Sequence, residues 1–485
     1  MSSSTEEPLL DNAAGEQKKT EMNQESVHLL SGADADTAGQ TSSSYLLANF
    51  TGMAMMFSIT HGCVVSCLSY ASSELGQTKG AWGSGTLFFV YAFASLLISK
   101  PVVAMLGGKW ALFAGLAGYC LYIGGFLFAV IFSGTDWLAW PVYMLTCVIG
   151  GLSGGLLWTA QGRYFTHNAK KYSDALEAEV NAGKEGRGRM EECEISVVNA
   201  KFAGMFALIY LGAEAVTKAA ATAIFLTCGE AAEYIVFASY FVAALAGAFF
   251  FLGSSDLGDK GSGDVSFAAT LNGVWDATTL LQNDRRIALM MPYQWAFGVC
   301  GSFISFYAFG TIVSGSDSLG DTWVGLLSAL ITLSGSTMAL PFTRISTNYG
   351  KEYVMVLGGV CFAWVGSVMY YVSDETLGTW GWIIPFFIVF GMGRGAWEST
   401  NKAVIADLVV DTPQHTASAF ACVSFNNGIF AAMAYYVFDY SSRLVTGTVV
   451  FVLALVGIVC YLMSARLHKE MKAAAAAGGD RMSDV

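Results

Sequence analysis

About twelve long apolar runs dominate this chain, and each is long enough to cross a lipid bilayer. A helix crosses the hydrocarbon core with roughly 20 mostly apolar residues. Backbone polar groups inside a bilayer need internal partners, so continuous runs are predicted to be helices, and their lack of alternation argues against a β-barrel. The runs cover residues 46–70, 82–99, 110–132, 137–159, 202–226, 234–252, 287–313, 323–340, 353–372, 380–408, 415–438 and 444–465.

The composition agrees with a membrane protein. The chain is 54% hydrophobic and only 13% charged, whereas soluble domains contain about 25% charged residues. The ten cysteines are scattered, mostly within the runs, so we expect them to pack as small apolar residues and to form neither a disulfide framework nor a metal site. The fold class is therefore predicted to be an all-α membrane protein with about 12 transmembrane helices.

Both ends of the chain are predicted to be disordered cytoplasmic tails, over residues 1–44 and 467–485. The first tail is polar and carries much of the acid behind the net charge of −12. Residues 25–30 in this tail fit an acidic dileucine sorting pattern. The expected address is therefore the plasma membrane or the endolysosomal membrane.

The distribution of Lys and Arg between alternate loops predicts the orientation. Most of these residues fall on one side of the predicted membrane, and the other side receives only Lys79, Lys218 and Arg443. Because positive residues concentrate in cytoplasmic loops, both termini are expected in the cytoplasm, which requires an even number of spans.

The chain also repeats itself. Lys109 and Lys351 precede the third and ninth runs at a separation of 242 residues, and Trp158 and Trp397 lie 239 residues apart. This predicts two six-helix bundles, 45–252 and 287–466, with a binding site between them near the midplane. The linker, 253–286, contains an amphipathic stretch that is expected to lie as a helix on the cytoplasmic membrane surface. The charged segment 165–197 could dock a partner, although a solvated loop is the favoured interpretation.

The sequence Leu-Trp-Thr-Ala-Gln-Gly at residues 157–162 resembles the hallmark of the Unc-93 family. This family is a divergent branch of the major facilitator superfamily. The resemblance implies a rocker-switch fold of six plus six helices, with spans one, four, seven and ten nearest a central cavity. It also implies links to potassium-channel regulation, ion homeostasis and receptor trafficking. Where relatives often have Asp and Gln in span ten, this chain has Arg394, Glu398 and Lys402.

Polar side chains within the runs are the candidate site residues, because intramembrane charges usually face a cavity or a partner. His61 lies roughly 22 Å into the first span, near the midplane. The residues expected to line a substrate or ion cavity are His61, Gln294, Arg394, Glu398, Asn426 and Asn427.

The remaining polar candidates are expected to serve gating or structure. Arg394, Glu398 and Lys402 share one helical face, and two interpretations stay open: Glu398 is a proton or cation site tuned by Arg394, or the three form a neutralising ladder. Glu214 and Lys218 are expected to form a structural pair, with Lys218 close to the outer surface. Gln161 and Arg163 are expected to cap span four and contact the loop after span two, and Lys109, Trp158 and Trp397 complete this group.

These observations favour a transporter. The chain shows no nucleophile–base pair, metal-ligand set or phosphate-binding loop, so an enzyme, a cofactor and a nucleic-acid partner are not expected. We expect a multi-pass protein that moves a small solute or ion through the lipid bilayer by alternating access, coupled to an ion gradient. The alternative is a non-transporting regulator of an ion channel, or a trafficking chaperone that binds another membrane protein.

Overall fold

The computed structural model describes residues 42–183, 190–258, 267–409 and 415–479. They belong to two compact units. The first unit is built from Met1–Phe50 and Thr166–Phe202, and the second from Thr51–Phe165 and Ala203–Val485. The tail up to residue 41, including the sorting pattern at 25–30, lies outside the described residues.

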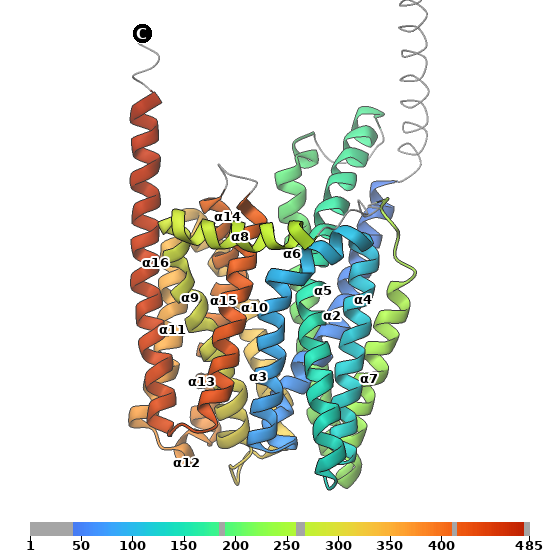
Figure 1. Cartoon of the computed structure of the whole chain (residues 1–485), viewed down its shortest axis with the longest axis vertical. Helices are drawn as coiled ribbons and strands as arrows, with labels where there is room; N and C mark the ends of the chain where they lie inside the picture. The colour runs from blue at the N-terminus through green and yellow to red at the C-terminus, as the bar shows by residue number, and fades with distance from the viewer. Residues whose placement is uncertain (1–41, 184–189, 259–266, 410–414, 480–485) are drawn as a thin grey trace, which may run out of the picture. The chain divides into compact units, whose positions relative to one another are not determined.

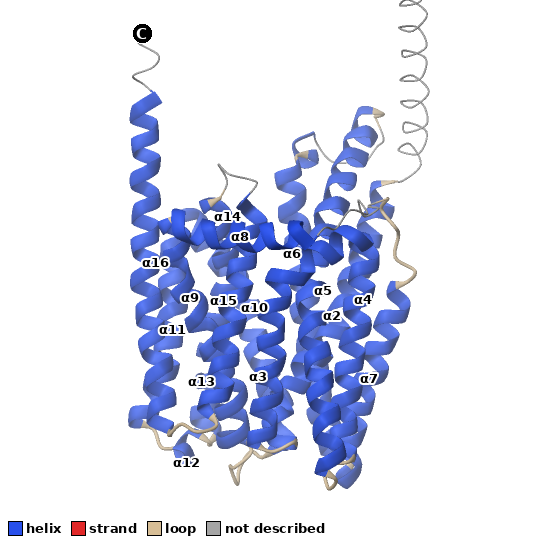
Figure 2. Ribbon diagram, viewed as in Figure 1, coloured by secondary structure: helices blue, strands red, loops and turns tan. Residues whose placement is uncertain are grey.

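The described residues form helices and short connections and contain no strand (Figures 1 and 2). The helices are α2 (Ser43–Glu74), α3 (Gln77–Phe93), η1 (Ala94–Ile98), α4 (Ser99–Ile131), α5 (Asp136–Asn181), η2 (Met190–Cys193), α6 (Ile195–Thr227), η3 (Gly229–Ala231), α7 (Ala232–Phe251), α8 (Phe267–Asn283), α9 (Arg285–Phe303), η4 (Ile304–Val313), η5 (Asp321–Trp323), α10 (Val324–Asn348), α11 (Lys351–Tyr371), α12 (Asp374–Leu377), α13 (Trp380–Ala396), η6 (Trp397–Asn401), α14 (Lys402–Leu408), α15 (Thr416–Phe438) and α16 (Arg443–Gly479).

The predicted all-α membrane fold is confirmed. Within the described residues, ten helices are long and apolar enough to cross a membrane. The predicted run 82–99, and the run 110–132 except for its last residue, fall inside one of these ten, Gln77–Ile131. The run 380–408 is helical as α13, η6 and α14 but is not among the ten. These two differences account for the step from twelve predicted runs to ten candidate spans.

Two glycines mark equivalent turns in the two halves of the chain. Gly107 interrupts α4 with φ 77° and ψ 167°, and Gly350 precedes α11 with φ 110° and ψ 153°. Side chains with a Cβ atom rarely adopt this backbone conformation. The glycines lie before the third and ninth runs, close to the repeat offset predicted from the sequence.

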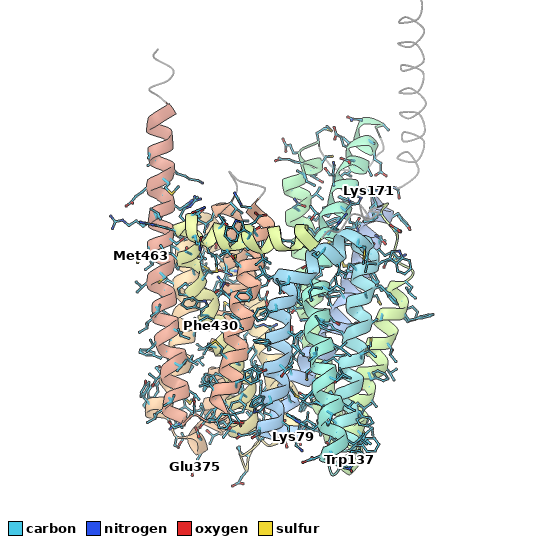
Figure 3. The ribbon with its side chains drawn as sticks, in the orientation of Figure 1. Lys79, Trp137, Lys171, Glu375, Phe430 and Met463 are labelled. Atoms are coloured by element: carbon cyan, nitrogen blue, oxygen red, sulfur yellow. The ribbon has the colours of Figure 1, made fainter. Side chains whose placement is uncertain are left out.

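In the second unit, long helices stand roughly side by side and α8 lies across one end of them (Figure 1). Helix α16 packs against α9 and α11, α10 against α13, and α4 against α7, while α15 packs against both α9 and α3. We call the end with α8 the α8 end. The opposite end carries α12, and Lys79, Trp137 and Glu375 are labelled there in Figure 3; we call it the α12 end.

The helix predicted in the linker is present as α8. Its Ala277 and Leu280 are buried in an apolar cluster with α9 and α15 residues, while Trp275 is exposed. Phe267 and Leu271, two of the residues predicted on its apolar face, have side chains outside the described set. Burial of one face against the bundle therefore holds α8 across the ends of the spans.

Two segments predicted to be irregular are helical. Helix α5 continues from the fourth span to Asn181, so the prediction of a loop from residue 165 is wrong over this part. Helix α16 continues to Gly479, where a disordered tail from 467 was predicted. Both extensions are rich in Ala, Lys and Glu, which favour helix without needing apolar burial. An ion pair between Arg466 and Glu470, one turn apart, also supports α16.

The first unit is held by polar and aromatic contacts. Ser43 donates to the Glu179 carboxylate from its backbone nitrogen at 3.1 Å and from its hydroxyl at 2.6 Å. The rings of Phe50 and Phe202 stack with centroids 4.3 Å apart. Lys201 Nζ donates to the Tyr172 hydroxyl at 2.9 Å. The start of α2, the end of α5 and the start of α6 therefore form this unit.

Candidate functional site

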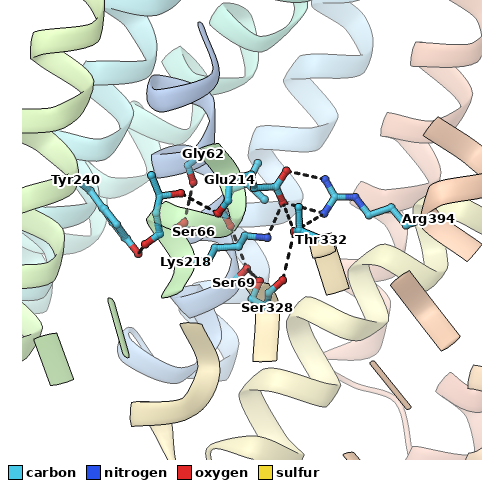
Figure 4. Close-up of polar contacts among 11 residues, drawn as sticks. Gly62, Ser66, Ser69, Glu214, Lys218, Tyr240, Ser328, Thr332 and Arg394 are labelled. Atoms are coloured by element: carbon cyan, nitrogen blue, oxygen red, sulfur yellow. Dashed lines mark hydrogen bonds and ion pairs between the residues drawn. The ribbon is translucent and has the colours of Figure 1, made fainter. Parts of the chain in front are cut away.

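Glu214 is the centre of a buried ion cluster in the second unit. Its side chain has no exposed surface. Its Oε1 accepts hydrogen bonds from Lys218 Nζ at 2.7 Å and from Thr332 Oγ1 at 3.0 Å. Arg394 donates from both terminal nitrogens, at 2.8 Å to Oε1 and 2.9 Å to Oε2 (Figure 4). Two cations and a hydroxyl group therefore satisfy one carboxylate.

This arrangement is what a carboxylate within a membrane bundle requires. A charge removed from water is stable only when it is paired and its lone pairs are hydrogen bonded. The planar Arg394 guanidinium meets both carboxylate oxygens at once, and Lys218 lies one turn after Glu214 on the same face of α6. The predicted Glu214–Lys218 pair is present, and the Lys218 side chain is only 3% exposed.

The cluster joins residues that are distant in the sequence. Glu214 belongs to α6 of the predicted first bundle, and Thr332 and Arg394 belong to α10 and α13 of the predicted second bundle. A second polar link joins the hydroxyls of Ser69 and Ser328, which are 3.1 Å apart. Polar contacts between α2 or α6 and the second bundle therefore occur at several levels of the second unit.

The face of Arg394, Glu398 and Lys402 becomes more accessible along the helix. The exposed fraction of the side chain rises from 13% at Arg394 to 21% at Glu398 and 46% at Lys402. These residues are separated by roughly 12 Å along the axis and approach the α8 end. Intervening residues Ala396, Trp397 and others of the same turns are buried. Side-chain exposure therefore increases along this face from the buried Glu214 cluster toward the α8 end.

The predicted ladder along this face is split. Lys402 Nζ donates to Glu398 at 2.9 Å, whereas Arg394 turns toward Glu214. The π-helix η6, Trp397–Asn401, lies within this stretch, and such bulges are frequent at functional sites because they redirect side chains.

Five aromatic side chains form the His61 cluster: Phe57, His61, Tyr119, Trp158 and Tyr210. The ring of His61 lies 5.3–5.7 Å, between centroids, from each of the other four. His61 is 7% exposed, and its Nδ1 has no hydrogen-bond partner. A buried ring nitrogen without a partner is costly, so Nδ1 is a polar atom that this cluster leaves unsatisfied.

Lys402 connects the His61 cluster to span ten. Its Nζ lies 5.7 Å from the centroid of the Trp158 ring and 5.8 Å from that of the Trp397 ring. Both distances allow a cation–π interaction. The residues predicted separately as gating tryptophans therefore face the same ammonium group.

Gln294 does not line an accessible face, contrary to the prediction. It has no exposed surface. Its amide accepts from Trp397 Nε1 at 2.8 Å and donates to Asn401 Oδ1 at 2.9 Å. A polar residue in a span can satisfy a neighbouring helix instead of a cavity, and here Gln294 ties α9 to the π-helix.

The two predicted asparagines are partly buried on α15. Asn426 accepts from Trp295 Nε1 at 2.8 Å and donates to the Cys422 carbonyl at 2.8 Å. Asn427 lies against Gly298 of α9, where a Cβ atom would meet it. Asn426 and Asn427 are therefore placed where α15 meets α9.

The predicted gating residues near α4 are only partly where they were expected. Arg163 donates to the Val103 carbonyl, at 3.4 Å, and so contacts the segment after the second span as predicted. However, Gln161 and Arg163 lie inside α5, so they do not cap span four. The Nζ of Lys109 lies 5.6 Å from the centroid of the adjacent Trp110 ring.

Sequence reasoning missed Thr332, Asn401, Tyr119 and Tyr210. Thr332 and the two tyrosines carry no charge, and such residues are common in spans. Only their positions opposite Glu214 and His61 distinguish them, and no periodicity reports such contacts. Among the described residues, no group of three or more His, Cys, Asp or Glu side chains could hold a metal ion.

The chain is similar to one protein family and to several solved structures. The family model for the ion channel regulatory protein UNC-93 matches residues 72–373. No protein of curated function matches the chain at a significant level.

Several solved transporters share the fold. The nucleoside transporter NupG is 16% identical with a TM-score of 0.52, over 87% of this chain and 99% of that chain. The xylose transporter XylE from E. coli, in a partially occluded inward-open conformation, is 12% identical with a TM-score of 0.55, over 87% and 96%. A peptide transporter, POT, in complex with sulfate, is 12% identical with a TM-score of 0.59, over 87% and 95%. At these identities the similarity establishes the major facilitator fold alone.

Proposed function

The chain belongs to the UNC-93 family, and we propose that it is a secondary transporter that moves a small solute or ion across its membrane by alternating access. The single observation that carries this proposal is the buried contact between Glu214 and Arg394. It joins the two predicted bundles, and side-chain exposure rises from the fully buried Glu214 to Glu398 and Lys402 on its α8 side. A site open to one side and closed by a breakable polar contact on the other is what alternating access requires.

The α8 end faces the cytoplasm in this proposal. The concentration of Lys and Arg in the segments expected on that side supports this orientation, with both termini in the cytoplasm. The acidic dileucine pattern at residues 25–30 supports a plasma membrane or endolysosomal address. The state described here is then open to the cytoplasm and closed at the α12 end.

Cysteine accessibility in sealed vesicles tests the proposal without a known substrate. Ser69→Cys places a thiol at the buried contact between Ser69 and Ser328, nearer the α12 end, where Ser69 is 5% exposed. Lys402→Cys places a thiol on the partly exposed face of Arg394, Glu398 and Lys402. Replacing the partly exposed Cys228 and Cys460 by Ser removes the competing native thiols. A membrane-impermeant maleimide is applied from each side in turn.

We expect Glu214→Gln to move the two labelling rates in opposite directions. Weakening the contact opens the α12 end, so the thiol introduced at position 69 reacts faster from that side, and the thiol introduced at position 402 reacts more slowly from the other. Glu352→Gln is the matched control, because Glu352 of α11 forms an ion pair with Lys469 of α16, at 2.6 Å, away from this contact. Rates that are unchanged, or that rise together, would exclude alternating access.

A second candidate function is regulation of an ion channel, favoured by the family's description as an ion channel regulatory protein. The first unit offers a folded helical segment for such a partner. In this case, coexpression with a potassium channel changes the channel current, and Glu214→Gln leaves that change intact. Loss of the effect on deleting residues 182–194, with labelling rates that never alternate, would favour this function over transport.

A further inference from the structure

We propose that the accessible face of Arg394, Glu398 and Lys402, together with the His61 cluster, binds a small organic anion that carries an aromatic ring. This inference rests on the proposed transport function and names the chemical class of its substrate. It is argued from the charge balance, the accessible donors and the aromatic surroundings of this one region.

The charged groups of the region are not balanced. Lys218, Arg394 and Lys402 are the cations, and Glu214 and Glu398 are the carboxylates. Both carboxylates are already paired, Glu214 with two cations and Glu398 with one. The region therefore carries one more cation than carboxylate, and this net positive charge extends along the face that leads to Lys402.

This excess argues against a cation as the ligand. A cation would have to displace Lys402 from Glu398, or Arg394 and Lys218 from Glu214. An anion instead is attracted by the net positive charge of the region and leaves each of these ion pairs in place. The predicted cation or proton site at Glu398 is therefore the less favoured use of this face.

Accessible donors for an anion are present on the same face. Lys402 Nζ donates one hydrogen bond to Glu398, and the side chain is 46% exposed. An ammonium group has three N–H donors, so Lys402 can pair with Glu398 and a ligand carboxylate together. Arg394 is 13% exposed and adds positive potential deeper in the bundle.

The aromatic groups define the rest of the ligand. Trp158 and Trp397 flank the Lys402 ammonium at nearly equal distances, and the His61 cluster continues from Trp158. Offset or edge-to-face contacts in such a cluster favour an aromatic ring. The buried and unpartnered Nδ1 of His61 offers a hydrogen bond to a polar substituent on it. A ligand with its carboxylate at Lys402 and its aromatic ring toward Trp158 would contact both the cation and the aromatic side chains.

Equilibrium binding of radiolabelled benzoate to the purified full-length protein in nanodiscs tests this inference. Benzamide and benzylammonium serve as competitors, because they keep the ring and replace the negative charge by no charge and by a positive charge. We expect unlabelled benzoate to displace the probe, and the other two compounds to compete at least tenfold more weakly. Equal competition by either compound, or no benzoate binding, would overturn the proposal.

Lys402→Gln locates the site. We expect it to weaken benzoate binding roughly tenfold or more, the loss expected for a charge-assisted hydrogen bond. Lys469→Gln removes an exposed lysine whose partner is Glu352 and should leave binding unchanged. Equal effects of the two variants would refute the assignment to Lys402. Binding does not require transport, so alternating labelling rates without benzoate binding would remove this inference and leave the proposed function standing.

Discussion

Removing the Arg394 guanidinium should destabilise the protein strongly, because it leaves a buried carboxylate short of a cation. Arg394 gives Glu214 two hydrogen bonds, at 2.8 and 2.9 Å, and Glu214 has no exposed surface. Breaking a buried ion pair from one side costs about 3–5 kcal/mol. Arg394→Gln should therefore lower the free energy of unfolding by about 3 kcal/mol, less than the upper value because Lys218 and Thr332 remain.

Reversible unfolding in mixed detergent micelles, followed by the helical circular dichroism signal, measures this loss. A control pair is available at Lys469 and Glu352, where the Lys469 side chain is 72% exposed. Exposed pairs contribute at most about 1 kcal/mol, so Lys469→Gln should have a small effect. A loss below about 1 kcal/mol for Arg394→Gln would refute the view that the Glu214 cluster is sealed from water.

A double-mutant cycle separates the ion pair from general damage to the fold. Glu214→Gln combined with Arg394→Gln removes both members, so the double variant should lose less stability than the two single losses together. Residues in direct contact typically show coupling energies of about 0.5–3 kcal/mol. Additive losses would mean that the two side chains do not interact in the folded protein.

Three further predictions concern the surrounding fold. Gly107→Ala should lower the unfolding free energy by about 1–3 kcal/mol, because the break in α4 needs a backbone conformation that alanine rarely adopts, and micelle unfolding measures this. Gln294→Leu should cost about 1–3 kcal/mol by leaving the Trp397 Nε1 donor buried without a partner, and a smaller loss would mean that water replaces the amide. Burial raises the pKa of Asp284, but the hydrogen bonds and charge of Arg286 outweigh it and hold that pKa below 3.8. The ionised Asp284 carboxylate therefore stabilises the folded protein at neutral pH, and this stabilisation is lost as the pH falls below that value. Thermal unfolding of Asp284→Asn between pH 3 and 7 should accordingly show a weaker acid dependence than that of the wild type.

The sequence predicts the spans well because burial in lipid imposes a long apolar run on each of them. It fails at residues 165–181 and 467–479, where hydropathy is low but helix propensity is high. Hydropathy reports where a helix meets lipid, and it does not report where the helix ends. The ends of α5 and α16 therefore could not be read from the apolar runs.

The site residues illustrate the difference between local and distant contacts. The one-turn pairs Glu214–Lys218 and Glu398–Lys402 were predicted from spacing, and both are present. The partner of Arg394 was not found, because Glu214 lies 180 residues away in the sequence. Helical periodicity orders residues within a helix, but the choice between two carboxylates for Arg394 depends on how the helices pack.

The position of Lys402 links the sequence repeat to the site. Trp158 and Trp397 are the repeated tryptophans of spans four and ten, and Lys402 Nζ lies almost equally far from both rings. Arg163 follows Trp158 by five residues, as Lys402 follows Trp397, but it donates to the Val103 carbonyl. Each of these two spans therefore contributes one tryptophan ring beside the ammonium group, while the cation itself belongs to span ten. For the anion proposed above, we therefore expect the negative end at Lys402, toward the α8 end, and the ring toward Trp158.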